Sequence, residues 1–443
     1  MKKFIIATLL STTIMPATTF AASEKEMEAR IKSLEARLAK FEKAFGNVDA
    51  YVEETVSKQL SEVAPASGDD SLKVKLGPGP RFSTADGKNT FEISGKMQVD
   101  ASFFNDDKAD HPDATNVRRA RLGISGKLLD DWKYKFEFDL AKDSTAITDI
   151  WMQYSGIDNL DLRAGQFREF LGMDVYTPNT YTLMTERAAP INAFAIPSYR
   201  KIGVAALSSG SNWSAQAGLF GERLNKVSTD DEGAGASARI TYAPIVGDNN
   251  IHLGIAGQYR KPDNATNSVR FKEKAGNAVQ TTNSIDVTVA NTDNYTVLGL
   301  EAAGNYGPLY VQAEYLDTNV NVSTGQDASF DGYYVQGSYM LTGEARSYSI
   351  KNGSYGHVKP AKPFKFGTDG IGAWEIGGHY SNTNLNDGAY TGGEMDIIGG
   401  IINWYPNNNM RFSANYTSAS TDNNAVTPND DPKVLTFRSQ LNF

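Results

Sequence analysis

The chain contains no cysteine and only four histidines among its 443 residues. Without cysteine it can have neither a disulfide scaffold nor a thiol that carries a lipid anchor. The histidines are scattered and fit no recognisable pattern of metal ligands or of a nucleophile with its base. Phosphate-binding loops and dinucleotide fingerprints are also missing. We therefore expect no cofactor, no metal site, no enzymatic activity and no nucleic-acid partner.

Long apolar runs are equally scarce, and the one near the start of the chain has the features of an export signal. Lys2 and Lys3 precede a short apolar run at residues 4–10, and small residues at Thr19 and Ala21 suit cleavage. Residues 1–22 are therefore predicted to be a secretory signal peptide. No later segment approaches the ~18 consecutive apolar residues that a membrane-spanning helix needs. The pattern predicts an exported protein without such a helix.

Residues 23–60 differ in pattern from everything that follows. Their apolar residues recur in steps of four and three, with Glu, Lys and Arg between them: Met27, Ile31, Leu34, Leu38, Phe41, Phe45, Val48 and Val52. This heptad pattern predicts a coiled-coil helix that self-associates, as a dimer or a trimer. A single amphipathic helix packed on a domain would carry the same stripe. Residues 61–71, SEVAPASGDDS, predict a flexible linker.

From residue 72 to 443 the chain alternates apolar and polar residues, segment after segment. Residues 132–140, WKYKFEFDL, place aromatic and aliphatic side chains on one face of a strand and charged ones on the other. A soluble sheet could bury the apolar face, whereas a membrane barrel would turn it to lipid. The chain also ends on an alternating strand at Phe443, which resembles the sorting signal of outer-membrane barrels. We therefore predict an all-β, antiparallel transmembrane barrel of roughly 14 to 18 strands over residues 72–443.

Basic residues follow the predicted lumen face. In residues 117–135, five cations share that face: Arg119, Arg121, Lys127, Lys133 and Lys135. Arg270, Lys272 and Lys274 recur at a spacing of two and predict a short cationic ladder in an extended segment. Several weak sites in a row attract anions without trapping them, as conduction requires. Strict alternation puts Arg118 on the lipid side, so either a bulge or a strand end must lie there.

The stretch VRRARLGISGKLLDDWKYKFEFDL at 117–140 resembles the matching hairpin of the phosphate-selective porin O/P family. So do GKMQVDASFF at 95–104, YVQAEYL at 310–316, GYYVQGSYMLTGEAR at 332–346, GAWEIGGHYS at 372–381 and NWYPNNNMRFSANY at 403–416. The resemblance covers nearly all of residues 72–443. It implies a bacterial outer-membrane porin with about sixteen strands, a homotrimer, inward-folded loops that form a constriction, and an arginine ladder leading anions to a phosphate site.

The resemblance also implies roles for individual residues. The constriction and anion-binding residues would be Arg118, Arg119, Lys133, Asp149 and Arg187, and the lumen ladder would comprise Lys96, Arg121, Arg270, Lys272 and Lys274. The inward-folded segment at 172–187 departs from the family pattern. Where phosphate-selective members place lysines and serines, this chain has Val175, Pro178, Asn179 and Thr180.

The expected function is therefore an outer-membrane channel that passes small anions such as phosphate or related oxyanions. Strict phosphate selectivity is discounted because tetrahedral phosphate needs several converging charged donors. The barrel would contact outer-membrane lipid and lipopolysaccharide, and the coiled coil would lie in the periplasm. The alternatives are a general or weakly selective porin whose coiled coil tethers the envelope, a cation-selective porin and an outer-membrane barrel enzyme.

Overall fold

The computed structural model describes residues 32–33, 35–36, 71–141, 145–195, 199–224, 231–247, 249–280, 282–424 and 430–443. The chain divides into two units, Met1–Ser71 and Leu72–Phe443. In the first unit Lys32–Ser33, Glu35–Ala36 and Ser71 are described, and the two pairs are helical. The predicted signal peptide, most of the predicted coiled coil and all of the predicted linker except Ser71 therefore lie outside the described residues. No helix in the described ranges is long and apolar enough to cross a membrane.

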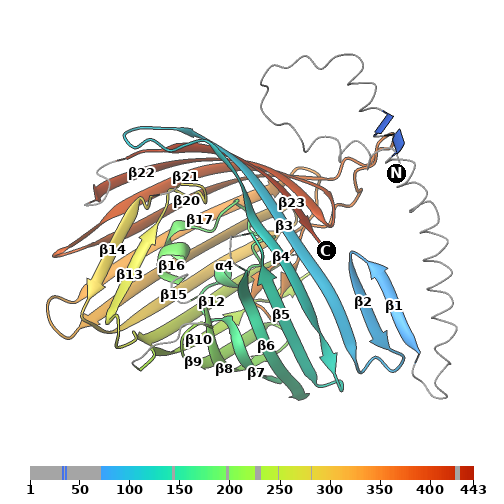
Figure 1. Ribbon diagram of the computed structural model, residues 1–443, viewed down its shortest axis with the longest axis horizontal. Helices are drawn as coiled ribbons and strands as arrows, with labels where there is room; N and C mark the ends of the chain where they lie inside the picture. Colours follow the sequence, from blue (N-terminus) through green and yellow to red (C-terminus); the bar gives the residue numbers. More distant parts are fainter. Residues whose placement is uncertain are drawn as a thin grey trace. The chain divides into compact units, whose positions relative to one another are not determined.

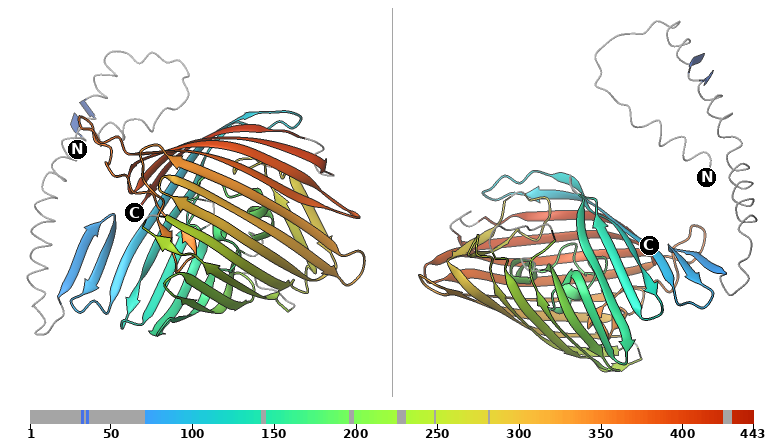
Figure 2. Two further views of the ribbon diagram at one scale, coloured as in Figure 1. Left: turned by 180° about the vertical axis from the view of Figure 1, so that it is seen from behind. Right: turned by 60° about the horizontal axis from the view of Figure 1, so that its bottom comes forward.

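The second unit is a closed antiparallel barrel of sixteen strands (Figures 1 and 2). The wall strands are β3 (Thr90–Asn105), β4 (Ala114–Leu128), β5 (Trp132–Asp139), β6 (Ala146–Ile157), β7 (Leu160–Arg168), β8 (Arg200–Ser209), β9 (Trp213–Phe220), β10 (Ala234–Tyr242), β12 (Asn249–Lys261), β15 (Thr292–Tyr306), β16 (Leu309–Val322), β17 (Ala328–Met340), β20 (Ala373–Asp387), β21 (Tyr390–Asn407), β22 (Met410–Asn424) and β23 (Lys433–Asn442). Each strand pairs with the next along the chain. The predicted barrel and its strand number are confirmed.

The last strand closes the barrel against the first. β23 pairs with β3 from Lys433 opposite Asn105 to Asn442 opposite Lys96. Phe443 continues this ladder, because its backbone N–H and C=O bond the C=O and N–H of Gly95 at 3.0 and 2.9 Å. The Phe443 ring lies over Gly95, where a side chain on residue 95 would collide with it. The terminal residue is thus part of the wall.

The two faces of the wall differ as the alternation predicted. On β3, Met97, Val99 and Phe103 are exposed on the outside, whereas Gln98 and Asp100 are buried on the inside. A band of exposed aromatic and aliphatic side chains around a polar interior is the arrangement of a barrel that faces lipid. Before the barrel, β1 (Leu72–Gly77) pairs with β2 (Gly79–Thr84), and β2 pairs with β3. β11 (Ile245–Val246) pairs with β12.

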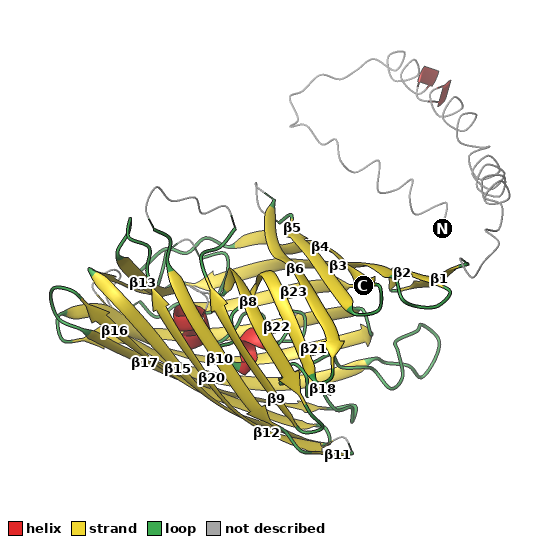
Figure 3. Ribbon diagram, turned by 90° about the horizontal axis from the view of Figure 1, so that it is seen from below, coloured by secondary structure: helices red, strands yellow, loops and turns green. Residues whose placement is uncertain are grey.

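Three connections fold into the barrel. The first joins β7 to β8 and contains α4 (Met173–Tyr176) and the π-helix η1 (Ile191–Ala195), and Figure 3 shows both helices enclosed by the ring of strands. The second joins β12 to β15 and forms a hairpin of β13 (Ser268–Glu273) and β14 (Ile285–Ala290). The third joins β17 to β20 and contains β18 (Tyr348–Ser349) and β19 (Ser354–Tyr355). The inward-folded loops that the resemblance implied are therefore present.

Apolar packing holds the first two connections against the wall. The Phe271 ring of β13 lies 5.8 Å from Phe194 of η1 and 5.7 Å from Phe330 of β17, between ring centroids. Around them Val287, Val289 and other buried side chains form one core inside the barrel. The third connection is held by a buried ion pair described below.

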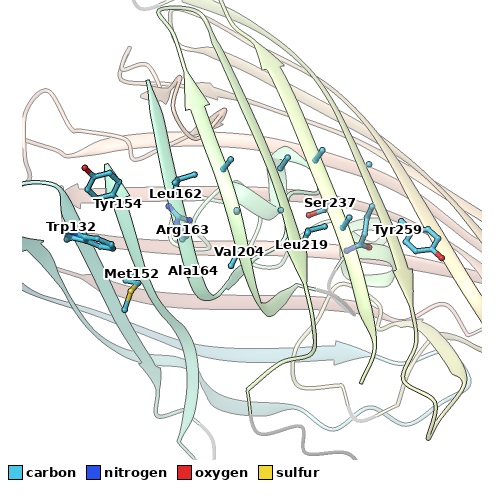
Figure 4. Close-up of a pocket in the computed structure, with 18 residues that line it drawn as sticks. Trp132, Met152, Tyr154, Leu162, Arg163, Ala164, Val204, Leu219, Ser237 and Tyr259 are labelled. Atoms are coloured by element: carbon cyan, nitrogen blue, oxygen red, sulfur yellow. The ribbon is translucent and has the colours of Figure 1, made fainter. Parts of the chain in front are cut away.

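The outer wall carries a shallow apolar depression of about 1050 Å³ across β5–β12 (Figure 4). It exists because small residues lie in register across four strands: Ala206 opposite Ala217, Ala217 opposite Ala238, and Ala238 opposite Gly257. Trp132 and Tyr259 flank it at its two ends. The depression faces away from the lumen and takes no part in the site described next.

Candidate functional site

A β-bulge in β4 turns two consecutive arginines into the lumen. Arg119 lies opposite Gln98 of β3, and the next pair is Val117 opposite Val99, so Arg118 is an extra residue without a partner in the ladder. Such an insertion changes which way the neighbouring side chains point. Both Arg118 and Arg119 contact groups inside the barrel. Of the two readings that strict alternation left open for Arg118, the bulge is correct.

Arg118 and Arg119 form a cluster with Arg438 of β23 around the carboxylate of Glu186. Arg118 donates from Nε and Nη2 to the two oxygens of Glu186 at 2.8 and 2.7 Å. Arg438 Nη2 donates to Glu186 at 2.8 Å and also to Asp100 at 2.6 Å. Arg119 Nη2 lies 3.7 Å from Glu186, and its Nη1 donates to Gln98 at 2.8 Å. We call Arg118, Arg119 and Arg438 the arginine cluster.

The cluster keeps a small excess of positive charge. Its three guanidinium groups face two carboxylates, Glu186 and Asp100, which leaves one net positive charge. Burial alone would raise the pKa of Glu186, but Arg118, Arg119 and Arg438 hold it well below its usual range. Glu186 is therefore ionised at neutral pH. The side chain of Glu186 is only 12% exposed, so its charge acts in a medium that screens it less than bulk water does.

The backbone that carries Glu186 is irregular, and side chains of the wall and of the third inward connection donate hydrogen bonds to its carbonyl groups. Gln98 and Gln440 donate to Asn179 and Thr180 at 3.2 and 3.1 Å. Further along the segment, the carbonyl groups of four residues accept hydrogen bonds from side chains: Tyr181 from Arg346, Thr182 from Arg411, Leu183 from Asn403 and Thr185 from Arg438. Non-helical backbone at membrane depth is tolerated only where its polar groups are satisfied inside the protein. These bonds fix the segment and hence the place of the Glu186 carboxylate.

A cavity of about 700 Å³ adjoins the cluster on the side of the long loops. Arg118 and Glu186 line it together with Arg270, Lys272 and Lys274 of the inward hairpin. The predicted ladder is thus extended and faces open space, although it stands on an inward hairpin and not on the wall. Its charge is partly compensated, because Arg270 donates to Asp286 at 2.7 Å. Glu273 also lines this cavity, and burial raises its pKa to about 8.

A second cavity of about 360 Å³ lies on the other side of the cluster. Lys96, Arg121 and Glu137 line it, with Thr180 and Phe443 among the other residues. Along β3 and β4 the pair Gln98–Arg119 separates the residues of this cavity, Lys96 and Arg121, from Val117 of the first cavity. The arginine cluster therefore stands between two open spaces.

A chain of alternating positive and negative side chains continues from the cluster along β4, β5 and β6. Arg121 contacts Glu137 at 3.0 Å and Asp139 at 2.8 Å. Lys135 contacts Glu137 at 3.2 Å and Asp149 at 3.1 Å. Asp149 also accepts from Arg200 at 2.9 Å. Asp149, predicted from the resemblance as an anion-site residue, is thus engaged by two cations of the chain itself.

Lys133 lies elsewhere than the resemblance implied. The register places it opposite Lys127 and Gln153, one residue after β5 begins at the short turn. Lys127 is eight residues from Arg119 along β4, which is ~26 Å at 3.3 Å per residue. Lys133, Lys135 and Glu137 share one face, so alternation alone could not tell which lysine stands near the acidic residues. Lys135 is the one that contacts Asp149.

Two other predicted residues are held by the inward segment. Lys96 donates to Asn179 at 2.6 Å and still lines the smaller cavity. Arg187 is buried, donates to the carbonyl of Thr177 at 2.8 Å and lies 3.3 Å from Asp174. Arg187 lines neither the 700 Å³ cavity nor the 360 Å³ cavity. Its contacts with Thr177 and Asp174 stabilise the inward-folded segment.

Sequence reasoning did not nominate Glu186, Arg438, Arg411 or Arg346. Arg411 and Arg438 do stand on the lumen face of alternating strands, which is the signal that could have found them. Their partners lie far away in the chain, however. Arg438 and Glu186 are 252 residues apart, so no local pattern links them.

Comparison with known proteins places this geometry in a known group. The sequence profile of the family described as "Phosphate-selective porin O and P" matches residues 91–443. Porin O of Pseudomonas aeruginosa is 26% identical over 401 residues, which cover 81% of this chain and 90% of that protein. A protein of Caulobacter vibrioides is 28% identical over 387 residues, which cover 83% of this chain and 75% of that protein.

Solved structures share the barrel at low sequence identity. An anion-selective porin from Comamonas acidovorans superposes with a TM-score of 0.54 at 12% identity, over 80% of this chain and 100% of that chain. The trimer form of OmpT from Vibrio cholerae superposes with a TM-score of 0.52 at 14% identity, over 80% of this chain and 99% of that chain. At these identities the likeness shows the fold alone.

Proposed function

Since the chain belongs to the phosphate-selective porin O and P family and forms an outer-membrane channel, not an enzyme, we propose that it passes small anions with weak selectivity. One observation carries this proposal. Arg270, Lys272 and Lys274 line the cavity on the long-loop side, and this cavity leads to Arg118 in the arginine cluster. A row of cations that ends at a cluster with one net positive charge attracts anions and repels cations.

Strict phosphate selectivity is not part of the proposal. The segment that faces the cluster has a buried Val175, and Asn179 already accepts a hydrogen bond from Lys96. The guanidinium groups of the cluster are bonded to carboxylates of the chain. Phosphate would meet few free charged donors, and charged donors are the strong ones.

Reversal potentials under a salt gradient test the proposal. The purified channel in a planar bilayer is expected to prefer chloride over potassium. Phosphate, sulfate and small dicarboxylates are then titrated into the chloride solution. Block by phosphate at low concentration would restore strict phosphate selectivity, and a preference for potassium would reject an anion channel in favour of a cation-selective porin.

We also propose a homotrimer in the outer membrane, surrounded by lipid and lipopolysaccharide, with Phe443 acting as a sorting signal. The trimer form of a porin of the same fold supports the assembly. Short turns of such barrels face the periplasm and long loops face outward. Residues 1–22 would be the export signal.

The heptads of residues 23–60 carry a second proposal, a periplasmic coiled coil that tethers the envelope or binds a periplasmic partner. Deletion of residues 24–60 tests it. If trimers and conductance survive while envelope integrity is lost, the tether is supported. If all three survive, the segment has no tethering role, and if trimers are lost, the coil acts in assembly.

A further inference from the structure

Glu186 occupies the place in which the arginine cluster would otherwise bind an anion from solution. Both of its carboxylate oxygens accept from Arg118, at 2.8 and 2.7 Å, and one also accepts from Arg438 at 2.8 Å. This paired geometry between guanidinium and carboxylate is among the strongest hydrogen-bond arrangements in proteins. At the same time Glu186 lines the larger cavity, so the group stands on the route of a permeating ion.

The carboxylate is also held in place. The segment that carries it is bonded at Thr182, Leu183 and Thr185 by side chains of β21, β22 and β23. A side chain on such a fixed backbone cannot move far from the arginines. It is a permanent ligand of the cluster, in contrast to an ion that arrives and leaves.

We propose that Glu186 is a built-in counter-anion that prevents the constriction from holding phosphate and so determines the weak selectivity of the pore. This inference rests on the proposed anion channel and deepens it. A permeating anion meets the residual positive charge of the cluster but must compete with Glu186 for the nitrogen atoms of Arg118 and Arg438.

The charge of an anion determines how strongly the competition with Glu186 weakens its binding to the cluster. Phosphate, with up to two negative charges at neutral pH, is repelled by Glu186 more than a singly charged ion is. A small monovalent anion, such as chloride or a short monocarboxylate, is attracted by the net positive charge of the cluster and passes through without replacing Glu186 as a ligand of the arginines. Glu186 therefore favours monovalent anions over phosphate.

The test replaces the carboxylate by an amide of the same shape, Glu186→Gln. The control is Glu394→Gln, which removes one negative charge from a residue on the outward-facing side of β21, where Met395 and Ile397 of the same strand face in. The chloride current of each channel is measured while inorganic phosphate is added, after its folded barrel has been verified by heat-dependent mobility on gels. Reversal potentials are recorded on the same channels.

In E186Q the half-blocking concentration of phosphate is expected to fall about tenfold or more, the effect of regaining one charge-assisted hydrogen bond. The E394Q channel should match the wild type. An unchanged half-blocking concentration in a folded E186Q channel overturns the inference. If E186Q does not fold, Glu186→Asp withdraws the carboxylate by one methylene group, and a half-block equal to that of the wild type then overturns it.

The two proposals fail in different ways. Anion preference in the wild type with no change in phosphate block in E186Q rejects only the role of Glu186. Cation preference in both channels rejects the anion channel itself.

Discussion

Arg118 and Glu186 meet as a two-pronged pair, with Nε and Nη2 of the arginine 2.8 and 2.7 Å from the two carboxylate oxygens. Arg118 reaches this position because a bulge in β4 adds one residue to the strand. Glu186 reaches the same position because side chains of the wall donate hydrogen bonds to backbone carbonyl groups of the segment that carries it. The pair joins the barrel wall to the inward loop at the point that separates two cavities.

Lys135 is expected to matter more for selectivity than Lys133. Lys135 compensates both Glu137 and Asp149, so Lys135→Gln leaves a partly buried and a buried carboxylate with less opposing charge and lowers the chloride preference. Lys133 stands near the short turn, where water screens its charge. Reversal potentials at 0.1 M salt compare the two variants, each of which removes one positive charge. An equal or larger effect of Lys133→Gln would favour the role implied by the family resemblance.

Selectivity should depend on pH through Glu273. Burial raises the pKa of Glu273 to about 8, so the group is mostly neutral at pH 7 and mostly ionised at pH 9. Its negative charge then faces Arg118, Arg270, Lys272 and Lys274 across the larger cavity, alongside Glu186. The chloride preference should therefore decrease from pH 7 to pH 9.

Glu273→Gln serves as the control for this pH effect. The variant cannot gain the charge, so its reversal potential should stay constant between pH 7 and pH 9. A wild-type channel whose reversal potential also stays constant would show that Glu273 does not titrate there.

The third inward connection should depend in part on the buried ion pair of Arg239 and Glu301, which acts alongside the buried pair of Arg346 and Glu375. Glu301 accepts from Arg239 at 2.7 and 2.6 Å, and Arg239 also donates to the carbonyl of Gly353 in that connection. Glu301→Gln leaves a buried arginine charge unpaired, which should cost about 3–5 kcal/mol of folding free energy. Asp286→Asn breaks the pair with the half-exposed Arg270 and should cost about 0–1 kcal/mol. Unfolding temperatures on semi-native gels compare the two variants, and equal shifts would contradict the account.

Much of the fold follows from local pattern. The period of two identifies the strands, their lipid faces and the lumen face on which Arg119, Arg121 and Lys135 stand, because each strand repeats the same constraint independently. The spacing of Arg270 and Lys272 likewise predicts an extended cationic edge. The alternation even marks Arg118 as anomalous, although it does not say whether a bulge or a strand end is the cause.

The site itself depends on contacts that no local pattern contains. Nothing near Arg270 in the sequence shows that its strand lies inside the barrel, since that depends on the packing of Phe271 against Phe194 and Phe330. The register of β5 decides that Lys135 and not Lys133 meets Asp149. The pairing of Glu186 with Arg438 joins residues 252 positions apart, so only the folded barrel brings them together.

The most direct test of the central claim is the reversal potential of the double variant Arg118→Gln, Arg119→Gln under a gradient of potassium chloride. The account predicts that the wild type prefers chloride. In the double variant the cluster loses two of its three guanidinium groups while Glu186 and Asp100 remain, so the preference should disappear or change to potassium. A folded double variant with the permeability ratio of the wild type would contradict the assignment of the arginine cluster as the selective element of the pore.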